Sequence, residues 1–543
     1  MIASDTLCNG CKDDSLAVMK TQCIPHSRLP GTSALFADYL YNFEPLKDFY
    51  RHDPNNPESI RDAAARADIP LERRLAVVSA LRRINGNSPS LDLLAQPGTV
   101  AIVSGQQVGL FGGPAYTLYK ALTALKLAQQ LTENGIPAVP IFWLATEDHD
   151  LAETDHCWIF GPDRRPRRIG ARVRGMAGQP VGSMVLDSVP LDELKETLQG
   201  LPFAAEVVER VAAAYQPGRT MGEAFRLLLS GLLGDRGLLF LDPMDPQIRE
   251  IAAPLLLDAF QKADALGDAI LSRDSALKAA GYHSQVLFEP QSSLFLRLEN
   301  NRRLALRRHE GAYFHESRRY ELAELASNPA ALSPNALLRP VMQDYLLPTA
   351  AYIGGPAEIA YFAQSEVLYH ALLGRMPVIL PRSGFTLLDE RAYKMLDRFD
   401  LTLLDCFQPE SQLREKIAAK LLPANLQSLF DAAGASVQDS TEQLRAALEG
   451  FDPTLAVAMQ KSGVKMRFQL DKMRGKAARE ALRREQRATE GAARLSGLLY
   501  PERHLQERLY SFLPFLAVHG FELIDTLYEQ TYRACPDHLL LTL

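Results

Sequence analysis

The sequence predicts an α/β fold in which a parallel β-sheet core is followed by a C-terminal α-helical coiled coil. Two segments, around residues 99–144 and 347–381, each have the pattern of a strand, a glycine-rich loop, a helix and a second strand. This order is typical of a βαβ unit, whose strands pair in parallel through a right-handed crossover. After Asp405 the pattern is helical to about residue 497. These observations predict a sheet-based part and a helical part.

The composition excludes several classes of protein. Among 543 residues there are 59 Lys and Arg and 65 Asp and Glu, so the net charge is −6 and no basic excess favours nucleic-acid binding. Every apolar run is shorter than the ~20 residues that a membrane helix needs, and no apolar signal region follows Met1. Six cysteines are too few for a disulfide scaffold. We therefore expect a cytoplasmic protein that binds neither membrane nor nucleic acid.

The N-terminal segment is expected to lie outside the fold. Residues 1–18 are predicted to form a disordered extension. Cys8 and Cys11 have the spacing of half a zinc site, and Cys23 and His26 are candidates to complete it. One pair of closely spaced cysteines does not make a four-ligand site, so the sequence leaves metal binding here open.

The first βαβ unit follows a helical region. Apolar spacing predicts mostly helix over 25–83, and the β-branched run 99–103 predicts a strand that ends in the loop 104–114. An apolar stripe over 118–131 predicts the next helix, and 139–144 has the composition of a buried strand.

The second unit repeats the loop of the first. It has a predicted strand at 347–353, a helix ending near residue 373 and a strand at 377–381. Its loop tetrapeptide, residues 354–357, is identical to residues 112–115, Gly-Gly-Pro-Ala. Proline favours the first helical position, and the N–H groups at a helix N-terminus bind anions. We therefore expect both helix ends to face one anion-binding crevice, together with the loop that follows residue 144.

A long insertion, at about 151–340, separates the two units. It is predicted to turn at Asn300-Asn301 and to contain strands at 237–241, 285–288, 293–298 and 304–307. We expect the core to span residues 19–404 and the helical region to span 405–543. Residues 461–490 hold ten basic and four acidic residues and no proline, which predicts a long exposed helix. Since such a helix needs a packing partner, a coiled coil between two chains is expected.

The residues with the clearest chemical pattern are Glu147, Asp148, His149 and Asp150, directly after the strand that ends near Leu144. Loops at the carboxyl ends of parallel strands bind ligands in open α/β sheets. Three carboxylates around one imidazole are suited to orient a substrate ammonium, to hold Mg²⁺ or to tune the histidine for proton transfer. One or two of these acids are equally suited to cap the next helix.

Two other functions stay open at this point. A metal-dependent hydrolase would use five nearby side chains as ligands: Asp148, His149, Asp150, Asp155 and His156. A non-catalytic dimeric scaffold would use only the coiled coil. The sequence contains neither a P-loop nor a His-Glu-x-x-His motif.

The sequence also resembles a known family. The residues that carry the resemblance are Ser-Gly-Gln-Gln-Val-Gly-Leu-Phe-Gly-Gly-Pro-Ala-Tyr-Thr-Leu-Tyr-Lys-Ala (104–121) and Val-Pro-Ile-Phe-Trp-Leu-Ala-Thr-Glu-Asp-His-Asp (139–150), with 354–364, 377–382 and 499–508. From about Met19 to the C-terminus the chain resembles the bacillithiol biosynthesis cysteine-adding enzymes, the BshC family of cysteine ligases. The resemblance implies a Rossmann-like core with connecting-peptide insertions, a C-terminal coiled coil and a homodimer. It also implies addition of L-cysteine to glucosaminyl malate, the last step of bacillithiol synthesis.

This chemistry suggests roles for particular residues. Joining a carboxylate to an amine needs activation, most simply by ATP, with or without Mg²⁺, as an acyl-adenylate or an acyl-phosphate. We expect His149 to be the general base, oriented by Asp148 or Asp150, and Lys120 and Arg382 to neutralise developing charge. The residues expected to bind the substrates or the nucleotide are Ser104, Gly105, Gln106, Gln107, Gly109, Gly112, Gly113, Tyr116, Lys120, Gly354, Gly355, Glu358, Tyr361 and Arg382.

Overall fold

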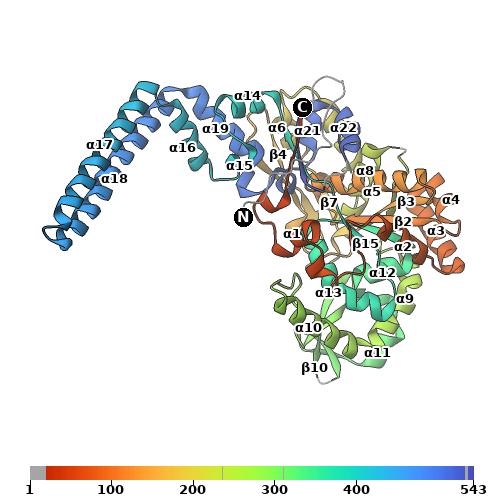
Figure 1. Cartoon of the computed structure of the whole chain (residues 1–543). Coiled ribbons are helices and arrows are strands. Elements are labelled where there is room, and N and C mark those ends of the chain that lie inside the picture. The colour runs from red at the N-terminus through yellow and green to blue at the C-terminus, as the bar shows by residue number, and fades with distance from the viewer. Residues whose placement is uncertain (1–19, 235, 310, 532–535) are drawn as a thin grey trace.

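A five-stranded parallel sheet lies at the centre of the computed structural model, which describes residues 20–234, 236–309, 311–531 and 536–543 (Figure 1). The strands are almost entirely buried, as expected of a parallel sheet covered on both faces. In spatial order they are β15 (Val378–Pro381), β14 (Thr349–Gly354), β2 (Val100–Gln106), β3 (Ala138–Leu144) and β8 (Leu239–Leu241).

Both predicted βαβ units are confirmed. The first runs through α5 (Tyr116–Glu133) from β2 to β3, and the second runs through α13 (Pro356–Leu372) from β14 to β15. Strands β2 and β14 are neighbours, and from them the chain winds outward in opposite directions, so that α5 and α13 pack into different apolar cores. The topological switch point of the sheet therefore lies between β2 and β14, where open α/β sheets place their ligands.

Helices precede the sheet, as predicted, but the described chain begins with a strand. A three-stranded sheet joins the two ends of the protein: β1 (Lys20–Ile24) pairs with β17 (His538–Thr542), and β17 pairs with β16 (Phe385–Leu388). The N-terminal helices are α1 (Ala34–Tyr41), α2 (Glu58–Arg66), α3 (Leu71–Asn85) and α4 (Pro89–Leu94). The extension predicted for residues 1–18, with Cys8 and Cys11, lies outside the described residues.

The insertion contains a second five-stranded sheet. Its strands, in spatial order, are β12 (Arg318–Tyr320), β11 (Ala312–His315), β10 (Arg302–His309), β9 (Ser292–Glu299) and β13 (Leu332–Pro334). The predicted turn is confirmed, because Asn300 and Asn301 both have positive φ angles, of 51° and 58°. The strand predicted at 285–288 is wrong. The backbone N–H and C=O of Val286 bond to the Gln364 side chain, at 2.9 and 2.8 Å, instead of to a neighbouring strand.

The remaining elements of the insertion are two hairpins and a set of helices that pack into the same apolar cores as the central sheet. They are β4 (His156–Phe160), β5 (Pro166–Gly170), β6 (Arg172–Arg174), β7 (Val185–Ser188), α6 (Leu191–Leu198), α7 (Ala204–Ala214), α8 (Met221–Leu233), α9 (Pro246–Gln261), α10 (Ala263–Ala279), α11 (Leu322–Ser327) and α12 (Arg339–Leu346).

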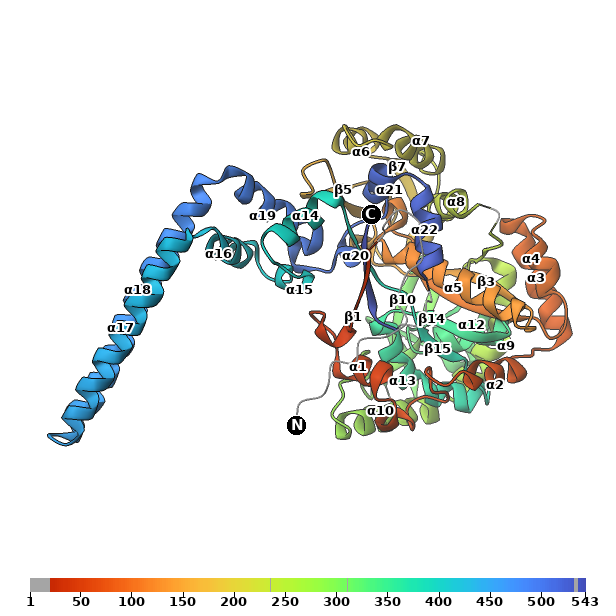
Figure 2. The same ribbon diagram turned by 45° about the horizontal axis from the view of Figure 1, so that its top comes forward.

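The C-terminal region is helical and includes a long arm. Helices α17 (Ala424–Glu449) and α18 (Pro453–Arg484) lie side by side and extend away from the body in Figures 1 and 2. The helix predicted over 461–490 breaks at Glu485, and its packing partner is α17 of the same chain. The other elements are α14 (Glu390–Arg398), α15 (Leu403–Cys406), α16 (Glu410–Leu421), α19 (Gln486–Leu499), α20 (Gln506–Leu509), α21 (Leu513–His519) and α22 (Glu522–Gln530). None of the helices in the described ranges has the length and apolarity to cross a membrane.

Candidate active site

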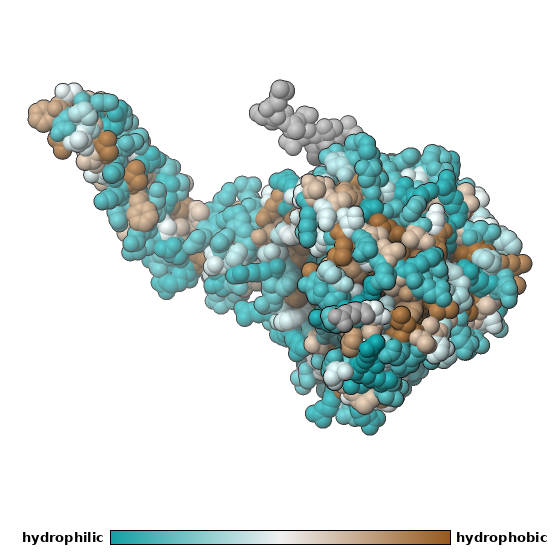
Figure 3. Space-filling model, turned by 90° about the horizontal axis from the view of Figure 1, so that it is seen from below, coloured by the Kyte–Doolittle hydropathy of each residue, from teal (hydrophilic) through white to brown (hydrophobic). Residues whose placement is uncertain are grey.

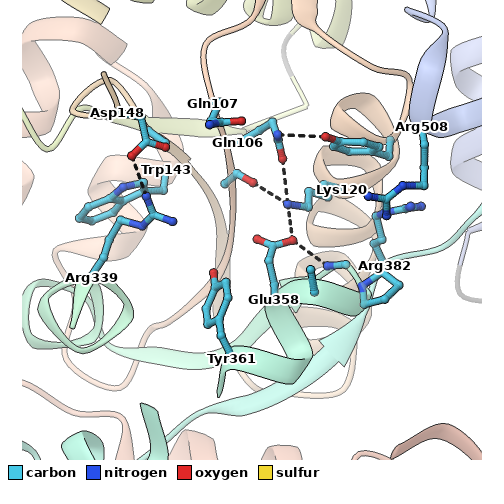
Figure 4. A pocket seen from close by; sticks show the side chains of 16 residues that line it. Gln106, Gln107, Lys120, Trp143, Asp148, Arg339, Glu358, Tyr361, Arg382 and Arg508 are labelled. Atoms are coloured by element: carbon cyan, nitrogen blue, oxygen red, sulfur yellow. Dashed lines mark hydrogen bonds and ion pairs between the residues drawn. The ribbon is translucent and has the colours of Figure 1, made fainter. Parts of the chain in front are cut away.

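A cavity of about 240 Å³ opens at the switch point between β2 and β14 (Figure 4). The strands end here in Gly105-Gln106 and Gly354, and helix α13 begins here. Ten of the predicted site residues line the cavity: Gly105, Gln106, Gln107, Tyr116, Lys120, Asp148, Gly355, Glu358, Tyr361 and Arg382.

A buried ion pair connects the two βαβ units across the cavity. The Lys120 ammonium on α5 lies 2.5 Å from the Glu358 carboxylate on α13 and donates to the Gly105 carbonyl and the Gln106 side chain at 2.9 and 3.0 Å. Burial lowers the pKa of Lys120, and the Glu358 carboxylate opposes this shift. Glu358 also accepts from the Gly355 N–H and the Tyr352 hydroxyl. The pair therefore fixes the start of α13 relative to the end of β2.

A second buried ion pair brings the C-terminal region into the wall of the cavity. Arg382, just after β15, donates two hydrogen bonds to Glu507 on α20, at 2.9 and 2.6 Å. Burial alone would raise the pKa of Glu507, but Arg382 outweighs it and holds that pKa at about 2. The neighbouring Arg508 lines the cavity, and its side chain makes no hydrogen bond or ion pair with the described residues.

The Glu147–Asp150 loop contributes only Asp148 to the cavity. The Asp148 carboxylate accepts from Arg303 on β10 and Arg339 on α12, both at 3.3 Å. Glu147 is fully buried behind it and accepts from Ser333 at 2.9 Å. The expected crevice is thus confirmed for Asp148 and for the start of α13, and the rest of the acidic loop lies outside the lining.

The other two residues of this loop face solvent. Asp150 caps the short helical turn that follows, because its carboxylate accepts from the Ala152 N–H. His149 is exposed, and in the described structure it makes no hydrogen bond with Asp148 or Asp150, so the expected orientation of its ring by these acids is wrong. Burial and the Arg303 charge lower the pKa of His149 below 6.5, which keeps the imidazole neutral at neutral pH.

The first Gly-Gly-Pro loop does not reach the cavity, which corrects the expectation for Gly109, Gly112 and Gly113. The Gly112 N–H donates to the Tyr215 hydroxyl, which in turn donates to the Gly109 carbonyl. A Cβ on Gly112 would lie 2.6 Å from the Phe512 ring, so glycine is needed here for packing against an aromatic side chain. The two identical tetrapeptides therefore serve different purposes.

Ser104 and Gly354 lie within the sheet, one residue short of the cavity. The Ser104 hydroxyl donates to the Ile353 carbonyl at 2.8 Å and ties β2 to β14, and the Gly354 carbonyl accepts from the Arg382 N–H at 2.9 Å. Both residues support the site without lining it.

Sequence reasoning missed three functional candidates: Trp143, Arg339 and Arg508. Trp143 lies inside a strand, and a strand tryptophan is usually a core residue. Arg339 is far from the glycine loops along the chain, and no local pattern distinguishes it from other arginines. Arg508 ends the segment 499–508 that carries the family resemblance, which is the signal that could have identified it. Together with Lys120 and Arg382 they give the cavity four cations against two carboxylates, those of Asp148 and Glu358.

The described structure does not bring the candidate metal ligands together. Within the described ranges, no three His, Cys, Asp or Glu side chains come together in a way that would hold a metal ion. His156, one of the five hydrolase candidates, contacts Asp155 at 2.9 Å on a neighbouring hairpin. Of the four zinc candidates only Cys23 and His26 are described, and His26 packs edge-on against Phe36.

Comparison with known proteins identifies the family. The N-terminal Rossmann-like domain of the bacillithiol biosynthesis protein BshC matches residues 19–383, and the C-terminal coiled-coil domain of BshC matches residues 385–543. The chain belongs to the BshC family. Its BshC Rossmann-like domain supplies most of the cavity wall, and its BshC coiled-coil domain supplies Glu507 and Arg508.

Relatives cover nearly the whole chain. A protein of Solibacter usitatus is 51% identical over 96% of this chain and 99% of its own length. Proteins of Koribacter versatilis and Staphylococcus carnosus are 38% and 28% identical, over 96% and 88% of this chain and 99% and 92% of their own lengths. Each of the three is named "Putative cysteine ligase BshC".

Proposed function

We propose that this protein is a ligase that adds L-cysteine to glucosaminyl malate, the last step of bacillithiol biosynthesis. The names of its relatives support the cysteine ligase activity. The observation that carries the proposal is the cationic cavity at the switch point of the Rossmann-like sheet, because L-cysteine and the malate acceptor both carry carboxylates.

The cavity has groups suited to bind these anions. Arg508 presents a guanidinium group with no partner among the described residues, and such a group matches the planar geometry of carboxylates and phosphates. Arg382 adds positive charge beside it, although its two terminal nitrogens already bond Glu507. Helix α13 begins at the cavity with Pro356, which has no N–H, and the Gly355 N–H is bonded to the Glu358 carboxylate. The N–H groups of Ala357 and Glu358 in its first turn are therefore the backbone donors left for an anion. The positive charges here would offset the negative charge of a bound malate carboxylate or phosphate group, which would stay ionised.

The reaction needs an activated carboxylate, and we propose ATP as its source. The residues that would hold its phosphates are Lys120, Arg382 and Arg508, whose charges lie along one side of the cavity (Figure 4). ATP would give the cysteine carboxyl a leaving group: phosphate from an acyl-phosphate, after ADP is released, or AMP from an acyl-adenylate, after pyrophosphate is released. Mg²⁺ would accompany the phosphates.

The acceptor amine must lose a proton before it attacks. We propose His149 as the base, since its lowered pKa leaves it unprotonated at neutral pH and it directly follows Asp148 in the cavity wall. The reacting amine would then be presented at the mouth of the cavity, where the exposed imidazole can reach it.

The test is a reaction of the purified protein with L-cysteine and glucosaminyl malate, with and without ATP and Mg²⁺, followed by mass spectrometry. We expect bacillithiol only when ATP is present, together with ADP for an acyl-phosphate or AMP for an acyl-adenylate. Product formed without nucleotide would overturn the ATP proposal. No product with any nucleotide would overturn the ligase proposal.

We also propose that the protein is a homodimer formed through the arm. Apolar side chains remain exposed on α17 and α18 after they have packed on each other, among them Leu429, Val464 and Phe468, which are 64%, 66% and 61% exposed. Figure 3 shows such side chains along the otherwise hydrophilic arm. Burial of this surface against a second arm would supply the favourable free energy of association.

A further inference from the structure

The two ends of the cavity differ chemically. Figure 4 shows Trp143, Asp148 and Arg339 together at one end and Lys120, Glu358, Arg382 and Arg508 at the other. At the second end Glu358 is paired with Lys120 and Glu507 is paired with Arg382, so Arg508 is the cation there without a carboxylate partner among the described residues. At the first end a carboxylate and a guanidinium lie side by side, and both line the cavity.

We infer that Trp143, Asp148 and Arg339 form a subsite for the ammonium and carboxylate groups of an α-amino acid. This inference rests on the proposed function, and it assigns to L-cysteine one end of the cavity. The anionic acceptor and the phosphates of ATP would then bind at the opposite end of the cavity.

Asp148 has a free acceptor for an ammonium group. Arg303 and Arg339 both donate to its Oδ1, and Oδ2 has no hydrogen-bond partner in the described structure. Arg303 is itself held rigidly, since it donates to the Ser333 hydroxyl at 2.9 Å and to the Pro334 carbonyl at 2.7 Å. The carboxylate is therefore fixed in place with one oxygen directed away from its arginine partners.

Arg339 and Trp143 have free donors for a carboxylate. The guanidinium has five N–H donors, of which Asp148 and Tyr361 use only a part. The Trp143 indole is 3% exposed and lines the cavity, and within the described chain its Nε1 has no acceptor. A buried N–H without an acceptor costs free energy, and a bound carboxylate would remove that cost.

The spacing favours an α-amino acid over the acceptor substrate. Asp148 and Arg339 are 3.3 Å apart, and an α-amino acid carries its ammonium and carboxylate on one carbon. In glucosaminyl malate the amine and the carboxylates are separated by sugar carbons and the glycosidic oxygen. That molecule would not place both groups on two side chains in direct contact.

The test is calorimetric titration of the full-length protein, with and without saturating malate, using three ligands. L-cysteine has both charged groups, cysteamine lacks the carboxylate and 3-mercaptopropionate lacks the amine. We expect L-cysteine to bind at least ~10-fold more tightly than either fragment, because each fragment loses one charge-assisted contact. Equal binding of L-cysteine and either fragment would overturn the subsite, as would no binding of L-cysteine in both conditions.

Variants then show which side chain binds the ammonium group and which binds the carboxylate group. Asp148→Asn should weaken L-cysteine and cysteamine at least ~10-fold and leave 3-mercaptopropionate unchanged, and Arg339→Gln should show the reverse selectivity. Trp143→Phe keeps the ring and should weaken only the ligands that carry a carboxylate. The matched controls Asp187→Asn and Arg302→Gln, at exposed positions, should bind all three ligands as the wild type does. Melting temperatures check that each variant is folded.

The outcomes separate this inference from the proposed function. If L-cysteine binds with this pattern but the turnover assay gives no product, the subsite stands and the ligase proposal fails. If product forms while Asp148→Asn leaves the KM for L-cysteine unchanged, the ligase proposal stands and the subsite is wrong.

Discussion

Single residues in this protein show how buried charges build a site. Lys120 and Glu358 belong to different βαβ units and are 3% and 18% exposed, so neither charge is well solvated by water. A buried ion pair gains little over an apolar pair, but removal of one partner leaves an uncompensated charge. The pair therefore makes the geometry of the cavity depend on both partners.

Lys120→Met should destabilise the protein by about 3 kcal/mol or more, because Glu358 loses its cation inside the wall of the cavity. The double variant Lys120→Met, Glu358→Gln should recover part of this loss. Lys126→Met, on the same helix and paired with the exposed Glu529, is the matched control and should cost about 1 kcal/mol or less. Urea unfolding gives the free energy of unfolding of all three variants. Equal losses of stability for Lys120→Met and Lys126→Met would show that the buried ion pair has no special role.

Glu507 predicts a pH dependence of stability. Its folded pKa is about 2 against an ordinary value of 4.5, so the unfolded chain binds a proton more readily. The stabilisation is complete above pH 4.5 and is lost as the pH falls towards 2. Glu507→Gln should cost about 3 kcal/mol at pH 7, and its difference from the wild type should shrink between pH 4.5 and 3. A difference that stays constant with pH would show that the pair is not ionic.

His149 gives a prediction about rate. If it is the base, His149→Ala should lower the rate at least ~100-fold, and its exposed position should limit the loss of stability to about 1 kcal/mol. Because its pKa lies below 6.5 and the neutral imidazole is the active form, the wild-type rate should rise with pH and reach its plateau by pH 7. Near-normal turnover with a lowered melting temperature would instead make His149 a structural residue.

At the scale of elements, glycines set how closely neighbouring segments approach. Gly105 is the clearest case, since a Cβ there would lie 2.8 Å from the Trp143 carbonyl oxygen on the adjacent strand. Gly112 allows the ring of Phe512 to pack against the first loop. Each glycine is required by a partner that is distant in the sequence.

Gly105→Ala should therefore push β2 away from β3 and cost about 1–3 kcal/mol, as overpacking does in a tight core. The matched control is Gly434→Ala in helix α17, where nothing lies within 4 Å of the new Cβ. This control should gain about 0.5–1 kcal/mol from the helix propensity of alanine. Thermal unfolding measures the stability of both variants. If Gly105→Ala leaves the stability unchanged, the close contact between position 105 and Trp143 is wrong.

In the molecule as a whole, the pairing of strands from the two ends of the chain positions C-terminal residues at the cavity. Strand β17 pairs with β1 and β16, so the C-terminal region is held against the Rossmann-like domain. This contact places Glu507 against Arg382 and Arg508 at the cavity. The arm, by contrast, projects from the body and contributes no residue to the cavity (Figure 2).

The arm leads to a prediction about association. Light scattering at micromolar concentration should give twice the chain mass of 60.2 kDa, and Phe468→Glu should shift the protein to monomer because it places a charge in the apolar contact. Leu287→Glu, at an apolar position on the body that is 81% exposed, is the control and should remain dimeric. A monomeric wild type would exclude the arm as a dimer contact.

Periodicity and motifs were enough to predict the two βαβ units, the helical C-terminal region and the family, because these signals are local in the chain. Three features could be seen only in the folded chain: β2 and β14 are neighbours, the Gly112 loop packs against Phe512, and Arg339 and Arg508 line the cavity. Strand order and side-chain direction are set by packing between distant segments. The same Gly-Gly-Pro-Ala sequence therefore lines a cavity in one unit and contacts an aromatic ring in the other.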